Sequence, residues 1–176
     1  MTTTVPSRLD HQQGPRRILG AGFEIVLHEG DRRAARVVPG SQRVCVTVAD
    51  AVLGAAGTPL AHDLAGTPGG SSCLCWGRAD GSIQVRASWA PPALLVSRQC
   101  ILMVPETPGA PGLSVMAPGD RLLMLSSSAY EAAPERMVRL LHEEPAHLLA
   151  ADAHDLLRVL FRDVPQAGGA VVTRLV

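Results

Sequence analysis

Three consecutive serines, Ser126, Ser127 and Ser128, are the residues of this chain that the sequence places best for chemistry. They end an apolar run, 122–126, that predicts a short buried strand. Glu131 stands three residues after Ser128, which is the spacing of a helix capping box. We therefore expect a strand that runs directly into a helix capped by Ser128. Such strand ends lie at the rim of a sheet, where binding sites are commonly built.

Two kinds of chemistry are open to these serines. A nucleophilic serine is not favoured, because no Gly-x-Ser-x-Gly elbow surrounds the three residues. Capping explains the hydroxyl of Ser128 without catalysis. The backbone N–H groups at the start of the helix can bind an anion such as a phosphoserine side chain. We therefore expect Ser126, Ser127 and Ser128 to contact an anion or a partner.

Histidines occur in patterns that only partly resemble functional sites. In 142–147 (HEEPAH) the two histidines stand five positions apart and a proline interrupts the helix. The zinc-binding HExxH pattern needs a spacing of four, which puts both histidines on one helical face. His62-Asp63 and His154-Asp155 each place an acid beside a base, but adjacency in sequence does not assemble a catalytic triad. The sequence therefore predicts a solvated helix end at 142–147.

Composition predicts a soluble cytoplasmic protein. The apolar fraction is 47%, the charged fraction is 18% and the formal net charge is zero, so neither nucleic acid nor an anionic membrane is favoured as a partner. The N-terminus has no apolar core, and no window approaches the roughly 20 apolar residues of a membrane span. In that compartment the four cysteines are expected to be reduced core thiols, with Cys73 and Cys75 on one face of a strand.

The order of the elements predicts one α+β domain at 17–176 after a flexible tail at 1–16. Apolar runs and turn residues predict a hairpin of 18–28 with 34–38, a strand at 43–49, a hairpin of 72–76 with 82–89, and strands at 93–96 and 100–104. The later chain predicts a loop at 105–119, helices at 134–143 and around 156–161, and a last strand at 170–175. Residues 51–71 have room for one short helix, at 59–64.

Trp76 and Trp89 are two of only five aromatic residues, and both fall in the second hairpin. We expect Ile83, Val85, Ala87 and Trp89 to share one face of it. Buried core is the ordinary place for a tryptophan. Should a layer above the sheet be missing, one of the two tryptophans is expected in an exposed patch that contacts a partner.

The segment 118–132, PGDRLLMLSSSAYEA, resembles a stretch of the metal-dependent protein phosphatases of type 2C. In the bacterial branch typified by stage II sporulation protein E, this stretch has the pattern PGD-x-LLLYTDG-x-x-EA. The positions that match are Pro118, Gly119, Asp120, Leu122, Leu123, Glu131 and Ala132. The metal-binding Asp-Gly pair of the family falls on Ser127 and Ser128.

Four further segments resemble the family while lacking its ligands. Residues 20–25 take the place of GGD-x-YD, with Gly22 and Ile25 where the family has aspartates. Residues 48–54 take the place of GD-x-SG-x-G and keep only Asp50. The remaining segments are 87–96, which resembles NAGHPPP-LLV, and Gly168-Gly169, which stands where the family has Asp-Asp.

The resemblance implies a shortened phosphatase-like β-sandwich without the chemistry of the family. That reaction needs two divalent cations held by several carboxylates, and Asp50 alone cannot hold them. We therefore expect no cofactor and no catalytic residue. Between Asp50 and Ser72, where the family has a long pair of helices, only about twenty residues remain. One helical layer is therefore expected to be missing.

The function implied is that of a catalytically inactive pseudophosphatase-like domain, which acts as a protein-binding or self-assembling regulatory module. By resemblance, its partner is another copy or a phosphoserine regulator of a sigma-factor switch. The alternative is a divergent Mn/Mg-dependent serine/threonine protein phosphatase acting on a phosphoserine regulator, with Asp50, Asp63 or Asp120 as ligands. A weaker alternative is an unrelated α+β protein that binds a small molecule.

Overall fold

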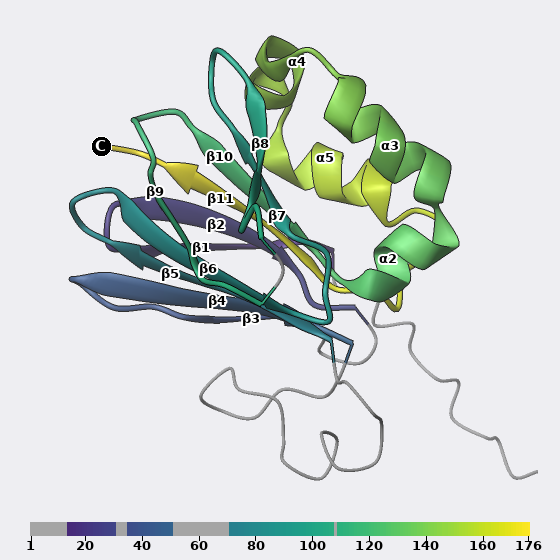
Figure 1. Ribbon diagram of the computed structural model, residues 1–176, viewed down its shortest axis with the longest axis horizontal. Coiled ribbons are helices and arrows are strands. Elements are labelled where there is room, and N and C mark those ends of the chain that lie inside the picture. Colours follow the sequence, from purple (N-terminus) through teal and green to yellow (C-terminus); the bar gives the residue numbers. More distant parts are fainter. Residues whose placement is uncertain (1–13, 31–34, 51–70, 108) are drawn as a thin grey trace, which may run out of the picture.

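Two antiparallel sheets packed face to face form the body of the protein, and short helices lie on one of them (Figure 1). The computed structural model describes residues 14–30, 35–50, 71–107 and 109–176. The larger sheet has the strand order β1 (Arg16–Gly20), β2 (Phe23–His28), β11 (Gly169–Arg174), β10 (Arg121–Leu125), β7 (Ala93–Val96), β8 (Ile101–Val104). The smaller sheet has the order β3 (Ala35–Val38), β4 (Arg43–Ala49), β5 (Ser72–Arg78), β6 (Ser82–Ser88), β9 (Gly112–Val115).

The helices that follow β10 cover the outer face of the larger sheet. They are α2 (Ser127–Ala132), α3 (Pro134–His142), α4 (Pro145–Ala150) and α5 (Ala153–Leu160). Proline begins α3 and α4, where its fixed φ suits a helix and its missing N–H costs nothing. Asp152 caps α5, because its carboxylate accepts from the backbone N–H groups of His154 and Asp155 at 2.8 and 3.1 Å. Among the described residues, no helix has the length and apolar character of a membrane span.

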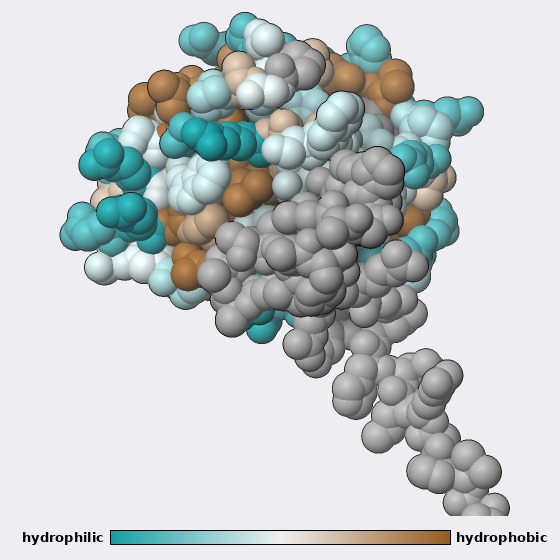
Figure 2. All heavy atoms as spheres, turned by 60° about the horizontal axis from the view of Figure 1, so that its bottom comes forward, coloured by the Kyte–Doolittle hydropathy of each residue, from teal (hydrophilic) through white to brown (hydrophobic). Residues whose placement is uncertain are grey.

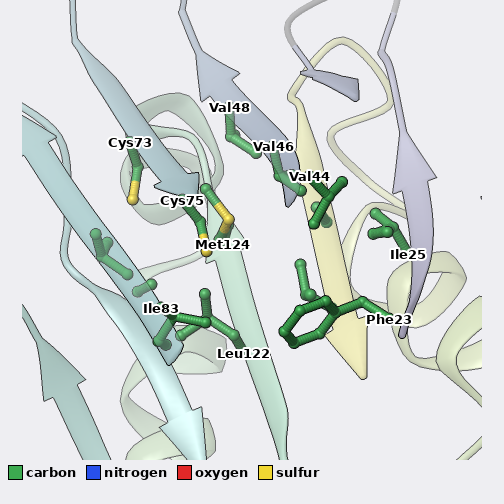
Figure 3. Packing of buried hydrophobic residues seen from close by; sticks show 14 of the residues in the cluster. Phe23, Ile25, Val44, Val46, Val48, Cys73, Cys75, Ile83, Leu122 and Met124 are labelled. Carbon is green, nitrogen blue, oxygen red and sulfur yellow. The ribbon is translucent and has the colours of Figure 1, made fainter. Parts of the chain in front are cut away.

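Apolar side chains fill two layers, one between the sheets and one beneath the helices. Figure 3 shows Phe23 and Ile25 of one sheet lying toward Val44 and its neighbours on the other. Alternate residues of a strand point to opposite faces, so Val26 belongs to the layer beneath the helices, with Leu157. The middle parts of strands β2, β10 and β11 are therefore buried on both faces, which explains the apolar runs 25–27, 122–125 and 170–172.

The cysteines follow the prediction in part. Cys73 and Cys75 lie in the layer between the sheets, each 1% exposed, and no cysteine forms a disulfide. Burial raises the pKa of Cys73 to about 12 and raises the pKa of Cys75 well above its ordinary value. Both thiols are therefore protonated and inert. Cys45 and Cys100 differ from the prediction because they are only half-buried.

Two antiparallel sheets with few, short helices confirm the predicted α+β sandwich. Within the ranges described, no helix lies on the outer face of the smaller sheet, where Val38, Leu113 and Val115 are exposed. Figure 2 shows hydrophobic side chains among hydrophilic ones on the side of the molecule turned forward. The short helix expected at 59–64 falls outside the described residues, so the expected loss of a helical layer stays a prediction.

The first predicted hairpin is wrong. The run 18–28 is itself a hairpin, since β1 and β2 pair around Ala21 and Gly22, whose φ values are 49° and 74°. The turn residues after His28 instead carry the chain to the other sheet, where β3 pairs with β4. Ala21 gives no turn signal of its own, and the stronger signal, at Gly30, belongs to a crossing between sheets.

The predicted helix cap is also wrong. α2 begins at Ser127 with Ser126 as its N-cap, and the Ser126 side chain makes no capping hydrogen bond. Ser128 lies in the first turn, where its hydroxyl donates to Asp50. The capping box of Ser128 with Glu131 therefore does not form, because the Ser128 hydroxyl donates to the Asp50 carboxylate instead.

Other strands and helices were predicted with small errors. The hairpin of β5 and β6 and the strands β7, β8, β10 and β11 agree with prediction within one or two residues. Strand β9 lies in the predicted loop 105–119, and α4 was not foreseen because it begins directly at Pro145. Trp89 is not on the inner face of β6, since that strand ends at Ser88.

Candidate functional site

Asp50 is the centre of a polar cluster at one end of the sandwich. Its Oδ1 accepts from the Ser128 hydroxyl at 2.5 Å, and its Oδ2 accepts from the Ser71 hydroxyl at 2.6 Å. The Ser128 backbone N–H lies 3.3 Å from both oxygens. β4 of the smaller sheet leads into Asp50, and α2 supplies Ser128 from the end of β10 in the larger sheet. The cluster therefore joins the two sheets.

Ser126 extends the cluster to a third segment. Its hydroxyl lies 2.9 Å from that of Ser128, and the Gly168 N–H donates to it at 3.3 Å. The Ser126 N–H in turn donates to the Gly168 carbonyl at 3.0 Å. The structure thus brings together Asp50, the serines and Gly168-Gly169, which the sequence singled out separately. Ser71 was not foreseen, because nothing in its loop distinguishes it from any other polar residue.

The cluster keeps Asp50 ionised. Burial by itself would raise the pKa of Asp50, but the hydrogen bonds from Ser128, Ser71 and Ser126 together lower the pKa below its ordinary value. At neutral pH the group is therefore a carboxylate. Each of its oxygens already accepts two hydrogen bonds, one from a hydroxyl and one from the Ser128 N–H. Among the described residues, the groups that donate to this carboxylate are neutral.

The described residues at this end do not fit two divalent cations. In the described ranges no group of three or more His, Cys, Asp or Glu side chains is placed to hold a metal ion. Asp120 lies at the far end of β10, where it accepts from the Ala117 N–H at 2.9 Å. At about 3.3 Å per residue, it is roughly 20 Å from Ser126. Asp120 therefore cannot share an ion with Asp50, and Asp63 lies outside the described residues.

Gly169, where the resemblance puts an aspartate, has no space for one. A Cβ at this position would lie 2.4 Å from Cζ of Phe161. Phe161 is 3% exposed and stacks on His28, with ring centroids 4.6 Å apart. An aromatic pair therefore fills the space that a ligand would need.

The placement of the family's first motif on 20–25 is wrong. Gly22 lies beside Arg174, at the end of the sandwich opposite Asp50. Gly30 does lie at the Asp50 end, because a Cβ there would approach the Gln166 carbonyl oxygen to 2.5 Å. In the sequence Gly30 is followed by Asp31. Asp31 lies outside the described residues.

The tryptophans lie on two different surfaces. Trp89 is 86% exposed with φ 53°, and its carbonyl accepts from the Ser127 hydroxyl at 3.5 Å, so it lies beside the Asp50 cluster. Trp76 is half-buried on the outer face of the smaller sheet. There it lines a groove of about 740 Å³ with Arg43, Leu113 and others. Trp89 has the exposure predicted for a contact residue, and the partner contact itself stays a prediction.

The remaining candidates within the described residues are not brought to this cluster. His147 lies on α4, where its Nδ1 is 2.8 Å from a Glu143 carboxylate oxygen, an exposed pair of the kind expected for a solvated helix end. That hydrogen bond raises the pKa of His147. His154 is in the first turn of α5. The pair His62-Asp63 lies outside the described residues.

Comparison with solved structures identifies the fold. No family model matches the sequence, and no curated protein matches it. The RsbU and RsbW domains of Rv1364c from Mycobacterium tuberculosis superpose with a TM-score of 0.57 at 16% identity, over 88% of this chain and 60% of that one. The phosphatase domain of SpoIIE from Bacillus subtilis, in a crystal form without domain swapping, gives 0.54 at 11% identity, over 87% and 92%.

A second SpoIIE structure holds the PP2C phosphatase domain and a fragment of the regulatory domain. It superposes with a TM-score of 0.54 at 12% identity, over 92% of this chain and 62% of that one. The chain therefore spans about three fifths of two of these chains. Identities this low establish the fold alone. The chain has the fold of the PP2C-type phosphatase domains of SpoIIE and RsbU, in a form with few, short helices.

Proposed function

We propose that this domain is a catalytically inactive relative of the PP2C phosphatases that works as a protein-binding regulatory module. One observation carries the proposal: each oxygen of Asp50 is already held by one hydroxyl and by the Ser128 N–H. A metal would have to displace those donors, and the described residues offer it no second carboxylate. From the described residues alone, two divalent cations would then be held by one charge, although hard cations need several charged oxygens.

The packing of Phe161 supports the same conclusion. The ring occupies the space beside Gly169, so the position cannot regain a ligand without moving a residue that is 3% exposed. In this proposal, the Phe161 ring and the serine hydroxyls occupy the end of the fold at which the phosphatases bind metal. The polar cluster then acts as a joint between the sheets.

A binding role is supported by Trp89. A tryptophan that is 86% exposed contributes little to the core, and tryptophan is among the residues most enriched at the centres of interfaces. Trp89 lies beside Ser127, so a contact through Trp89 would lie at the same end as the cluster. The proposed partner is a protein: another copy of the chain, or a phosphoserine regulator of a sigma-factor switch.

An anion-binding role for the serines needs a rearrangement. The Ser128 N–H already donates to Asp50, so a phosphoserine would have to displace that carboxylate. Phosphate and the Asp50 carboxylate would also repel each other at this distance. Contact through Trp89 is therefore the better supported mode of binding.

The proposal is tested by turnover of a phosphoserine peptide, measured with Mn²⁺, with Mg²⁺ and with a chelator. We expect phosphate release no faster than in a buffer blank under all three conditions. Metal-dependent release that disappears in Asp50→Asn would instead establish the divergent phosphatase. Asp31→Asn and Asp63→Asn would then show which carboxylates outside the described residues complete the metal site.

A further inference from the structure

The edges of the two sheets differ in charge from one side of the sandwich to the other. On one side, β1 carries Arg16 and Arg17, which pair with Glu29 and Glu24, and β3 carries Arg36. On the other side, β8 (ILMV) and β9 (GLSV) carry no charge. Charged side chains are a common means of preventing a free edge from pairing with another strand. Only the side formed by β8 and β9 lacks this protection.

Strand β9 has the features of an open edge. One of its edges pairs with β6, and no described strand pairs with the other. Leu113 and Val115 lie on the outer face, 77% and 67% exposed. No charged residue occurs in 107–119. The edge is therefore apolar and uncharged over its whole length.

The sequence of β9 is complementary to itself. In an antiparallel pair centred on Ser114, Leu113 lies opposite Val115 of the second strand, and both are on the outer face. Cross-strand pairs of this kind stabilise a sheet, whereas a charge near the two-fold axis would meet its own copy. We propose that two copies of this chain associate through β9, so that the two five-stranded sheets become one continuous sheet.

Neighbouring residues set the expected strength of this dimer. Leu102 and Met103, on the uncharged edge β8, are 44% and 51% exposed and add apolar surface on the same side. Pro111 and Pro118 flank β9 and cannot donate to a ladder, so pairing is limited to a few residues. A ladder this short buries less than the roughly 800 Å² per partner of a standard interface. The dimer should therefore be weak and depend on concentration.

This inference rests on the proposed function, to which it adds β9 as a contact surface separate from Trp89, with another copy of the chain as the partner there. Its test is sedimentation velocity of the full chain over a wide concentration range. We expect a reversible shift from monomer to dimer. Leu113→Lys should raise the dissociation constant about tenfold or more, since each dimer would bring two lysines against apolar side chains. The exposed position of Leu113 leaves the thermal unfolding midpoint nearly unchanged.

Leu19→Lys is the matched control. Leu19 is also apolar and 64% exposed, but it lies on the edge strand β1. It should leave the dissociation constant unchanged. A chain that stays monomeric at all concentrations would overturn the inference, and so would a dimer that Leu19→Lys weakens and Leu113→Lys does not.

Cross-linking tests the register. A mixture of Leu113→Cys and Val115→Cys chains should form a disulfide-linked dimer on mild oxidation, faster than Leu113→Cys alone or the unmodified chain. Equal rates in all three samples would exclude the register and with it the proposed pairing. Turnover is measured on the same preparations. Metal-dependent turnover in a dimer would refute the proposed function only, and an inactive monomer would refute only the dimer.

Discussion

Each end of the sandwich holds a charge, half-buried at Asp50 and buried at Arg174, and the described residues give neither one an ion-pair partner. At one end Asp50 accepts hydrogen bonds from Ser71 and Ser128. At the other end Arg174, 6% exposed, donates to the carbonyls of Ala21, Gly22 and Ala79 at 3.2, 3.3 and 2.7 Å.

Both clusters connect the two sheets, but they do so through different kinds of hydrogen-bonding group. Arg174 joins the turn after β1 in the larger sheet to the turn after β5 in the smaller one, and it lies 5.0 Å from the centre of the Phe23 ring. The Asp50 cluster joins β4 to β10 and β11. The Arg174 end is built from backbone carbonyls, whereas the Asp50 end is built from serine hydroxyls and a backbone N–H.

The largest effect is expected when a ligand is restored at the Asp50 end. Gly169→Asp would force a carboxylate into Phe161 and should cost about 4 kcal/mol or more of the free energy of unfolding. Gly169→Ala isolates the steric part and should cost less. Urea denaturation measures both. A Gly169→Asp protein of normal stability would show that Phe161 does not close the position.

Removing the charge at the opposite end should cost slightly less. Arg174→Met leaves the Ala21 and Ala79 carbonyls without this donor, while the Gly22 carbonyl keeps the Leu175 N–H, and the substitution should lower the free energy of unfolding by about 3 kcal/mol. Arg86→Met is the control, because Arg86 is exposed on β6 and should change stability by less than about 0.5 kcal/mol. Equal effects of the two substitutions would mean that the hydrogen bonds of Arg174 do not stabilise the contact between the two sheets.

Asp50→Asn should cost about 1–2 kcal/mol at pH 7, because the hydroxyls lose a charged acceptor. The lowered pKa of Asp50 means that its stabilisation is present above the unfolded pKa of about 4 and is lost as the pH falls through the folded pKa. The difference between Asp50→Asn and the unmodified chain should therefore shrink below about pH 4. A difference that grows on acidification would contradict the hydrogen-bond account; Glu106→Gln, at an exposed position, controls for general acid effects.

The smallest effect is expected at Trp89. Trp89→Gly should change the free energy of unfolding by less than about 0.5 kcal/mol, because the side chain is 86% exposed and glycine accepts φ 53° without strain. The same substitution should abolish binding of a protein partner that contacts this end. A large loss of stability would show that the Trp89 side chain stabilises the fold, and would contradict its proposed role in a contact surface.

Local patterns predicted much of the fold, since period-two runs and Gly-containing turns specify strands such as β5 and β6 before any tertiary contact forms. Predictions from local patterns failed where a group distant in the sequence determines the local structure. Ser128 was assigned to a cap because Asp50, which takes its hydroxyl, stands 78 residues away. Arg174 was not foreseen, because only the assembled turns provide its carbonyl partners. Strand β9 was missed because pairing with β6, and not its own sequence, makes it a strand.

Titration calorimetry with Mn²⁺ and with Mg²⁺ tests the central claim most directly. The account predicts no saturable binding at the Asp50 end, and no difference between the unmodified chain and Asp50→Asn. Binding of about two ions per chain that is lost in Asp50→Asn would contradict it. The end of the sandwich that holds Asp50 would then be a metal centre completed by carboxylates outside the described residues.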